Sequence, residues 1–278
     1  MKFLQALKEA IASLSANKTR SLLTVLGIVI GVGAVIGVLS IGQGAEASII
    51  GQIESIGTNV IYVYRGNSAK NVTNPRNLTL TDADALSNRV RAPHILNVAS
   101  VLFGQTSVRF GDESTQTSIM GVAENYAEVT DLDLSEGSFF TESNVTSRSS
   151  VVVVGPELAE RLTGRRTGII GTTVHINNYP FRVVGITTAK GGSQFSNPDL
   201  DVYIPITTMQ MRVQRQSDTN AVDFLLIQAQ DSQSIDLAIQ EAKSILRTTH
   251  RLTSRQPDDF TLTNQEDILS IANSITKI

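Results

Sequence analysis

The sequence predicts an α+β protein with one N-terminal transmembrane helix and, beyond it, a split β-α-β domain that carries an inserted small β subdomain. Three observations predict this class. A run of 25 uncharged residues follows a basic N-terminal stretch. Two groups of β-branched strands and helix-periodic segments follow that run, and a strand-rich stretch separates them. With 278 residues, 41% of them hydrophobic, the chain can bury a sizeable core.

Residues 21–45 are predicted to cross a membrane. Their central 20 residues, 22–41, would rise about 30 Å as a helix, which is the thickness of the hydrocarbon layer. Residues 1–20 hold four Lys or Arg and one Glu, a net charge of +3 against −6 for the remainder. The positive-inside rule therefore places residues 1–20 in the cytoplasm, with Lys18 and Arg20 as the cytoplasmic flank, and the rest outside the cell membrane.

Two other interpretations of this segment are weaker. A cleavable signal peptide would use Ala45-Glu46-Ala47, but its apolar region usually runs only about 7 to 15 residues. A buried core helix would leave the one-sided basic flank unexplained.

Residues 1–16 have apolar side chains at helical spacing, which predicts an amphipathic helix in the lipid headgroup region or, alternatively, a helix that docks on a cytoplasmic partner.

Within the span, Gly27, Gly31, Gly33 and Gly37 form two G-x-x-x-G spacings, which predict a small-residue face for packing against another membrane helix. The alternative is that glycine is simply common in membrane helices.

A two-helix stalk is predicted from the two ends of the domain. Ile49 and Ile53 continue a helical stripe beyond the span. A capping pattern, Thr263-Asn264-Gln265-Glu266, precedes a second stripe. The apolar positions that define this second stripe are Ile268, Ile271 and Ile275. The second helix would return the chain to the membrane surface, where a second span is expected and the sequence stops.

The domain between the stalk helices is predicted to contain two β-α-β units that share one sheet in a split, ferredoxin-like arrangement. In the first unit, Thr81 and Asp84 are expected to open the helix; in the second, Asp231 caps it. The expected boundaries are 1–20 (cytoplasmic helix), 21–45 (span), 46–58 (stalk), 59–125 (first half), 126–219 (inserted β subdomain), 220–263 (second half) and 264–278 (stalk).

No pattern of catalytic residues is present. The sequence has no G-x-S-x-G elbow, no Walker A loop and no H-x-x-x-H or H-E-x-x-H spacing. His94, His175 and His250 are interpreted as surface or turn residues, and the paired aspartates as caps or solvated groups. We therefore predict no catalytic, cofactor or metal residues, and no enzyme. Clustered basic residues and aromatic platforms are lacking, which excludes nucleic acid.

A series of motifs resembles one family in order along the chain. The runs RSLLTVLGIVIGVGAVIGVLSIGQGA at 20–45 and IGTNVIYVY at 56–64 are similar to the first transmembrane helix and domain entry of MacB/FtsX-type ABC transporter permeases. Further similar motifs are TLTDADAL at 79–86, EGSFFT at 136–141, SSVVVVGPELAERL at 149–162, IIGTTVHINNYPFRVVGI at 169–186, DVYIPITT at 201–208 and NQEDIL at 264–269.

The resemblance implies a split porter-like domain with an inserted β subdomain, and a permease-type subunit of an ATP-driven exporter. It implies an ABC ATPase, a second permease copy, an optional periplasmic adaptor and membrane lipid as partners, and no cofactor. Because the family has four membrane helices, the sequence is expected to be a truncated or split permease. The alternative is a single-pass binding or sensor module without transport, and a membrane-tethered enzyme is a third possibility.

Overall fold

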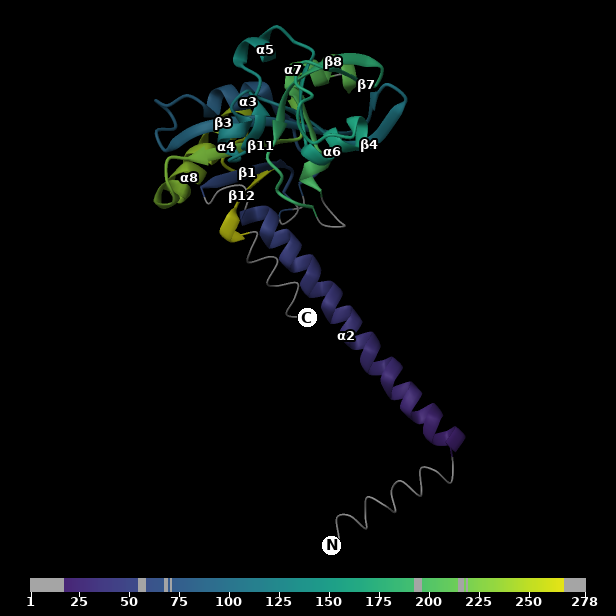
Figure 1. Cartoon of the computed structure of the whole chain (residues 1–278). Helices are drawn as coiled ribbons and strands as arrows, with labels where there is room; N and C mark the ends of the chain where they lie inside the picture. Colours follow the sequence, from purple (N-terminus) through teal and green to yellow (C-terminus); the bar gives the residue numbers. More distant parts are fainter. Residues whose placement is uncertain are drawn as a thin grey trace. The chain divides into compact units, whose positions relative to one another are not determined.

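The computed structural model describes residues 18–54, 59–67, 70, 72–192, 197–214, 218 and 220–267. The chain divides into two compact units (Figure 1). One comprises Met1–Gly51 with Ala272–Ile278, and the other comprises Gln52–Ile271. Each unit is described by itself below.

The described part of the first unit is a single helix. Helix α2 runs from Lys18 to Glu54 without interruption, about 55 Å at 1.5 Å per residue. Its portion Lys18–Val38 is long and apolar enough to cross a membrane, with a mean hydropathy of 2.5. The helix therefore continues without interruption from the predicted span as far as Glu54, and the stalk stays a prediction.

The second unit is a mixed α/β domain. Its strands are β1 (Val60–Arg65), β2 (Leu78–Thr79), β3 (Ile95–Phe110), β4 (Glu113–Val122), β5 (Leu134–Gly137), β6 (Val151–Val154), β7 (Thr173–Ile176), β8 (Tyr179–Thr187), β9 (Val202–Pro205), β10 (Ala221–Val222), β11 (Phe224–Ala229) and β12 (Phe260–Asn264). Its helices are α3 (Leu80–Leu86), α4 (Tyr126–Val129), α5 (Glu142–Thr146), α6 (Pro156–Thr163), α7 (Ile206–Thr208) and α8 (Ile235–Thr249), with short turns η2 (Pro198–Leu200), η3 (Met209–Val213) and η4 (Ser232–Ser234).

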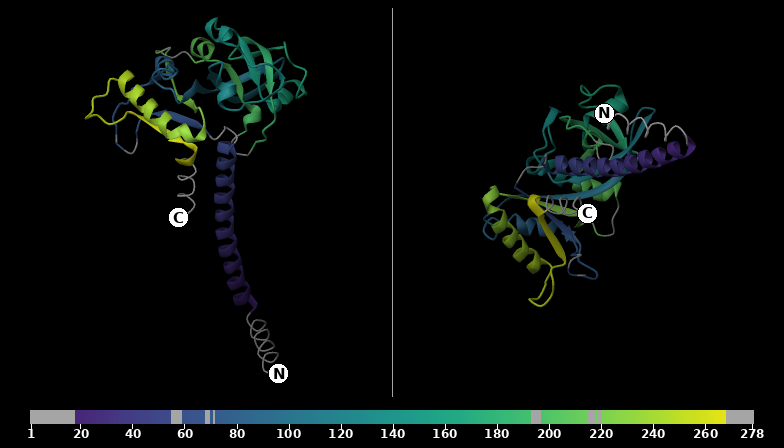
Figure 2. Two further views of the ribbon diagram at one scale, coloured as in Figure 1. Left: turned by 90° about the vertical axis from the view of Figure 1, so that its left-hand side faces the viewer. Right: turned by 90° about the horizontal axis from the view of Figure 1, so that it is seen from below.

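Four strands form the first part of the domain, in the antiparallel order β12-β1-β11-β3. The two β-α-β segments therefore interleave, since β11 of the second lies between β1 and β3 of the first. Helices α3 and α8 pack together against one face (Figure 2). Alternation along β1 explains this layer: Ile61 and Val63 point into the core shared with Ala242 and Leu246 of α8, whereas Tyr62 points to the opposite face.

The strands between these segments close into a small barrel. Strand β3 pairs with β4, and the ring continues through β9, β6, β8 and β7 back to β3. The interior is filled by buried apolar side chains such as Val108, Val174 and Phe181. Because the β3–β4 hairpin belongs to both parts, the sheet does not break at the predicted boundary of residue 126. The predicted Asn177-Asn178 turn between β7 and β8 is confirmed, with φ of 47° and 68° at the two residues.

Two predicted helix caps are displaced. Helix α3 is capped by a box between Thr79 and Asp82, not by Thr81 and Asp84. After β12, the two reciprocal hydrogen bonds of the capping box join Asn264 and Asp267. The predicted pair was Thr263 and Glu266. The predicted Asp231 cap is confirmed, because its carboxylate accepts the Ser234 N–H at 2.8 Å.

Candidate functional site

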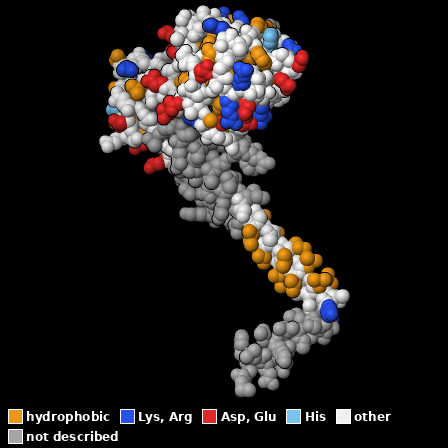
Figure 3. All heavy atoms as spheres, in the orientation of Figure 1, with side chains coloured by type: hydrophobic (Ala, Val, Ile, Leu, Met, Phe, Trp, Pro, Cys, Tyr) orange, Lys and Arg blue, Asp and Glu red, His pale blue; other side chains and the backbone are white. Residues whose placement is uncertain are grey.

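The apolar part of α2 is the first candidate, as a surface for lipid or other helices. Its large hydrophobic side chains from Leu22 to Val38 are each at least half exposed, and Figure 3 shows them along the visible face of the helix. Lys18 and Arg20 are exposed at its start, where Thr24 Oγ1 donates a hydrogen bond to the Arg20 carbonyl at 2.8 Å. An apolar surface this large is typical of a segment that faces hydrocarbon.

The four glycines of α2 do not share one face. At about 100° per residue, Gly27 and Gly31 lie on one side, and Gly33 and Gly37 lie on another about 120° away. A Cβ added at any of the four would meet no described atom within 4 Å. The predicted single face is therefore two separate G-x-x-x-G faces, and each is open to a neighbour.

The predicted stalk residues are only partly placed. Ile49 and Ile53 lie on α2, and the positions of their side chains are not described. Ile268, Ile271 and Ile275 lie outside the described residues. Their role in a stalk stays a prediction.

The second unit contains a buried charge cluster that the sequence did not predict. His250 lies in the turn that follows α8, as one of the two predicted settings allows, but it is 5% exposed and therefore not a surface residue. Its Nδ1 lies 2.7 Å from Oδ1 of Asp259, and its Nε2 lies 3.5 Å from Oδ2 of Asp82. Both aspartates are also buried, which corrects the solvated interpretation of Asp259.

The cluster connects three segments that are far apart in the sequence. Asp82 begins α3, His250 ends α8, and Asp259 precedes β12. Arg76, in the loop before β2, donates its backbone N–H to Asp259 at 3.1 Å and its guanidinium to the His250 carbonyl at 3.2 Å. The helix layer and the last strand are therefore held by the same ion cluster.

The electrostatics favour a charged histidine between two carboxylates. Burial alone would lower the pKa of His250, but pairing with Asp82 and Asp259 outweighs it and raises that pKa. Burial acts to raise the pKa of Asp82, but its pairing with His250 and the bond from Thr79 lower it to about 2. The Thr79 hydroxyl donates to Asp82 at 2.7 Å and not to the histidine, so the cluster does not form a nucleophile–base pair.

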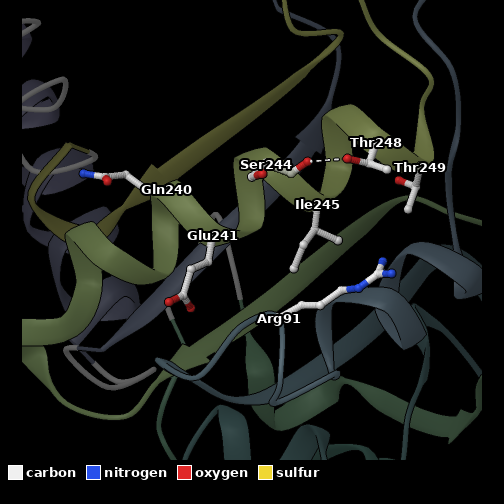
Figure 4. Close-up of a pocket in the computed structure, with 7 residues that line it drawn as sticks. All are labelled: Arg91, Gln240, Glu241, Ser244, Ile245, Thr248 and Thr249. Atoms are coloured by element: carbon white, nitrogen blue, oxygen red, sulfur yellow. Dashed lines mark hydrogen bonds between the residues drawn. The ribbon is translucent and has the colours of Figure 1, made fainter.

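A polar groove lies along α8, with a volume of about 560 Å³ (Figure 4). Figure 4 shows Arg91 and Ile245 on its two sides. The Thr248 hydroxyl donates a hydrogen bond to the Ser244 carbonyl at 2.9 Å. The Glu241 carboxylate pairs with Nδ1 of His94 at 2.6 Å. These polar groups are therefore already paired within the protein. No group of three metal-ligating side chains occurs among the described residues.

A second pair of carboxylates is formed by Asp199 in η2 and Asp201 directly before β9, and Asp201 lines a pocket of about 460 Å³. Burial, and then the charge of Asp199, raise the pKa of Asp201 to about 7. This aspartate was quoted in the sequence only as part of DVYIPITT, and no local pattern marks it.

Comparison with known proteins identifies the family. The sequence profile described as "MacB-like periplasmic core domain" matches residues 21–245, from the apolar helix into α8. The chain belongs to this family. The predicted resemblance to MacB-type ABC transporter permeases is therefore confirmed, and the domain is the periplasmic core domain of such a permease.

Individual relatives and solved structures are also similar to this chain in sequence and in fold. The macrolide export ATP-binding/permease protein MacB of Chlorobium luteolum is 31% identical over 99% of this chain and 41% of its own length. The chain thus spans about two fifths of this curated relative. The periplasmic region of MacB from Actinobacillus actinomycetemcomitans has a TM-score of 0.64 at 23% identity, covering 83% of this chain and 98% of that one. The extracellular domain of the transporter YknZ from Gram-positive bacteria has a TM-score of 0.60 at 20% identity, covering 74% and 100%.

Proposed function

We propose that the chain acts as a permease-type subunit of an ATP-driven exporter and transmits motion from a partner ATPase to its extracytoplasmic domain. The observation that carries this proposal is the family match, which begins in the membrane helix at residue 21 and ends at residue 245 within α8. Alignment of 99% of this chain with 41% of a relative named as an ATP-binding/permease protein supports it. The 278 residues contain no Walker motif, so the proposal assigns ATP hydrolysis to residues outside this sequence.

The proposed topology follows from the charge pattern. Residues 1–20, with Lys18 and Arg20, face the cytoplasm, and the split porter-like domain lies outside. Helix α2 is continuous over 37 residues, so a displacement at its membrane end can pass to the predicted stalk positions Ile49 and Ile53 without a hinge. Ile268, Ile271 and Ile275 would form the second stalk helix. A second permease copy, membrane lipid and an optional periplasmic adaptor complete the proposed assembly, without nucleic acid.

The direct test is co-purification. The full chain, tagged at its C-terminus, is co-expressed with the ABC ATPase encoded beside its gene and purified in mild detergent, with an unrelated single-pass protein carrying the same tag as control. We expect the ATPase to co-purify with the chain and not with the control. Recovery of membrane-bound chain without the ATPase would overturn the proposal.

The two glycine faces of α2 are proposed to pack against neighbouring membrane helices. Gly31→Leu fills the Gly27/Gly31 face and is expected to lower the yield of cross-linked permease dimer or permease complex by roughly half. Val25→Leu, which enlarges a residue between the two faces, is the matched control and should leave the yield unchanged. Equal yields from both variants would show that this face does not pack.

A single-pass binding module without transport is the second candidate. The specific observation in its favour is the polar pocket beside Asp201, because a binding protein needs such a site and a purely mechanical subunit does not. It predicts a membrane-bound chain that purifies without an ATPase and still binds a ligand.

A further inference from the structure

The pocket beside Asp201 lies on the outer face of the β3–β4–β9 strands. Phe103 of β3 pairs with Met120 of β4, and Gln105 pairs with Ser118, so these four side chains line one face in two adjacent rows. Strand β9 runs parallel to β4 with Met120 opposite Tyr203, which places Asp201 two residues earlier beside Ser118. The pocket encloses about 460 Å³, the size range of small-molecule sites.

The segment that carries Asp201 is held firmly. The Asp201 N–H donates to the Pro198 carbonyl at 3.1 Å, and its own carbonyl accepts the Gly155 N–H at 2.9 Å. The Thr117 hydroxyl donates to the Leu200 carbonyl at 2.6 Å. Gly155 permits this approach, since a Cβ there would lie 2.1 Å from the Asp199 carbonyl oxygen. The backbone that carries the Asp201 side chain is therefore fixed in position before any ligand arrives.

The two carboxylates of this pair differ in their partners. Asp199 accepts the N–H groups of Lys190 and Gly191 at 2.8 and 3.1 Å. The side chain of Asp201 has no hydrogen bond or ion pair to any described residue, although the residue is partly buried and lies near the Asp199 charge. A carboxylate that faces a pocket without a cation has a negative potential that a positive ligand would neutralise.

The rest of the lining favours an organic cation over a metal ion. Among the described residues that line the pocket, Asp201 is the one carboxylate, and Gln105, Gln116 and Ser118 are neutral. The opposite end of the pocket is apolar: the Phe103 ring is 43% exposed, and Met120 lies beside it. An exposed aromatic ring and a thioether accept both apolar groups and ammonium groups.

We propose that this pocket binds organic ammonium compounds, with the ammonium group at the Asp201 carboxylate and an apolar or aromatic body on Phe103 and Met120. The inference goes beyond the proposed function because it assigns a ligand site that operates whether or not the chain transports its ligand.

The test uses the full chain in nanodiscs of phosphatidylcholine, with empty nanodiscs subtracted. The probe is a naphthylmethyl-trimethylammonium ion, whose fluorescence anisotropy is measured at pH 8; the chain contains no Trp that would interfere. We expect saturable binding that Asp201→Asn weakens about tenfold or more. Asp112→Asn makes the same chemical change in the exposed β3–β4 turn and should leave binding unchanged.

Two further comparisons test the ligand class. Phe103→Ala should weaken binding of the probe several-fold, whereas Leu237→Ala, a similarly exposed apolar residue on α8, should not. Naphthylmethanol and naphthylacetate should bind far more weakly than the cation. Equal binding of the neutral alcohol, unchanged binding by Asp201→Asn, absence of probe binding, or displacement of the probe by millimolar Ca²⁺ would each overturn the proposal.

The pH dependence gives an independent readout because the probe has a permanent charge. The titratable groups around Asp201 are Asp199, Tyr126 and Tyr203, and the two tyrosines stay neutral because burial raises their pKa values. Affinity should therefore rise between pH 6 and 8 in the wild-type chain and stay flat in Asp201→Asn. A pH dependence that persists in the variant would contradict the assignment to Asp201.

Discussion

Two pairs of carboxylates in the extracytoplasmic domain differ in whether a positively charged side chain lies beside them. Asp82 and Asp259 lie on either side of the His250 ring, which can carry a positive charge between them. Asp199 and Asp201 also interact electrostatically, but Asp201 has no cation beside it among the described residues. The pKa of Asp82 is lowered and the pKa of Asp201 is raised, although both side chains are substantially buried.

The difference separates a structural cluster from a candidate binding site. A compensated buried cluster stabilises the native state as long as all its members are present. An uncompensated buried carboxylate costs stability at neutral pH, and such groups concentrate where ligands bind. The comparison therefore makes opposite predictions for the removal of His250 and of Asp201.

The largest expected effect is for His250→Leu. This change leaves two buried carboxylates without their cation, so we expect the free energy of unfolding at pH 6 to fall by about 3 kcal/mol. His94→Ala is the matched control, because His94 pairs with Glu241 near the surface and its loss should cost at most about 1 kcal/mol. Urea unfolding followed by circular dichroism measures both. Equal, small losses would show that the cluster is not a stabilising element.

The next effect has the opposite sign. Asp201→Asn removes a carboxylate that the fold holds in an unfavourable environment, and we expect the variant to be about 2 kcal/mol more stable than the wild type at pH 8. Asp112→Asn, in the exposed turn, should change the free energy of unfolding by less than about 0.5 kcal/mol. A destabilised Asp201→Asn variant would mean that the carboxylate has a stabilising partner in solution.

The pH profile of stability gives a smaller but more detailed test. Because the pKa of Asp201 is raised from 3.8 to about 7, its contribution lowers stability as pH rises from about 4 to 7. The pKa of His250 is raised above 6.5, so its contribution is present below pH 6.5 and is lost as pH rises through the folded value. Asp82 stabilises above pH 3.8, and this is lost toward pH 2.

Each variant should remove its own part of this profile. Asp201→Asn should flatten the decline between pH 4 and 7, and His250→Leu should flatten the decline above pH 6.5. A profile that is identical in the wild type and both variants would contradict the two assignments. Denaturation midpoints measured at half-unit pH steps are sufficient.

The sequence predicted the elements whose signals are local. The apolar span, the strand runs, the Asn177-Asn178 turn and the Asp231 cap depend on composition and spacing within a few residues. Cap positions were displaced where two overlapping patterns competed. Thr79-x-x-Asp82 and Thr81-x-x-Asp84 both fit a capping box, and the structure uses the first, in which Asp82 also reaches His250.

The candidate sites were not predictable because their members meet only in the folded domain. His250 and Asp82 are 168 positions apart in the sequence and belong to different β-α-β segments. Asp201 gains its character from burial beside Asp199 and from the absence of a cation, and neither property is encoded in a local motif. The closure of the barrel through β3 and β7 likewise depends on pairing between distant strands.

The measurement that decides most directly whether this is a membrane-anchored extracytoplasmic domain is cysteine labelling. The chain has no native Cys, so Asp112→Cys and Ser15→Cys each create one reporter thiol. In spheroplasts treated with a membrane-impermeant maleimide, Asp112→Cys should be labelled at once and Ser15→Cys only after permeabilisation. Labelling of Ser15→Cys with protection of Asp112→Cys would place the domain in the cytoplasm and contradict the proposed function.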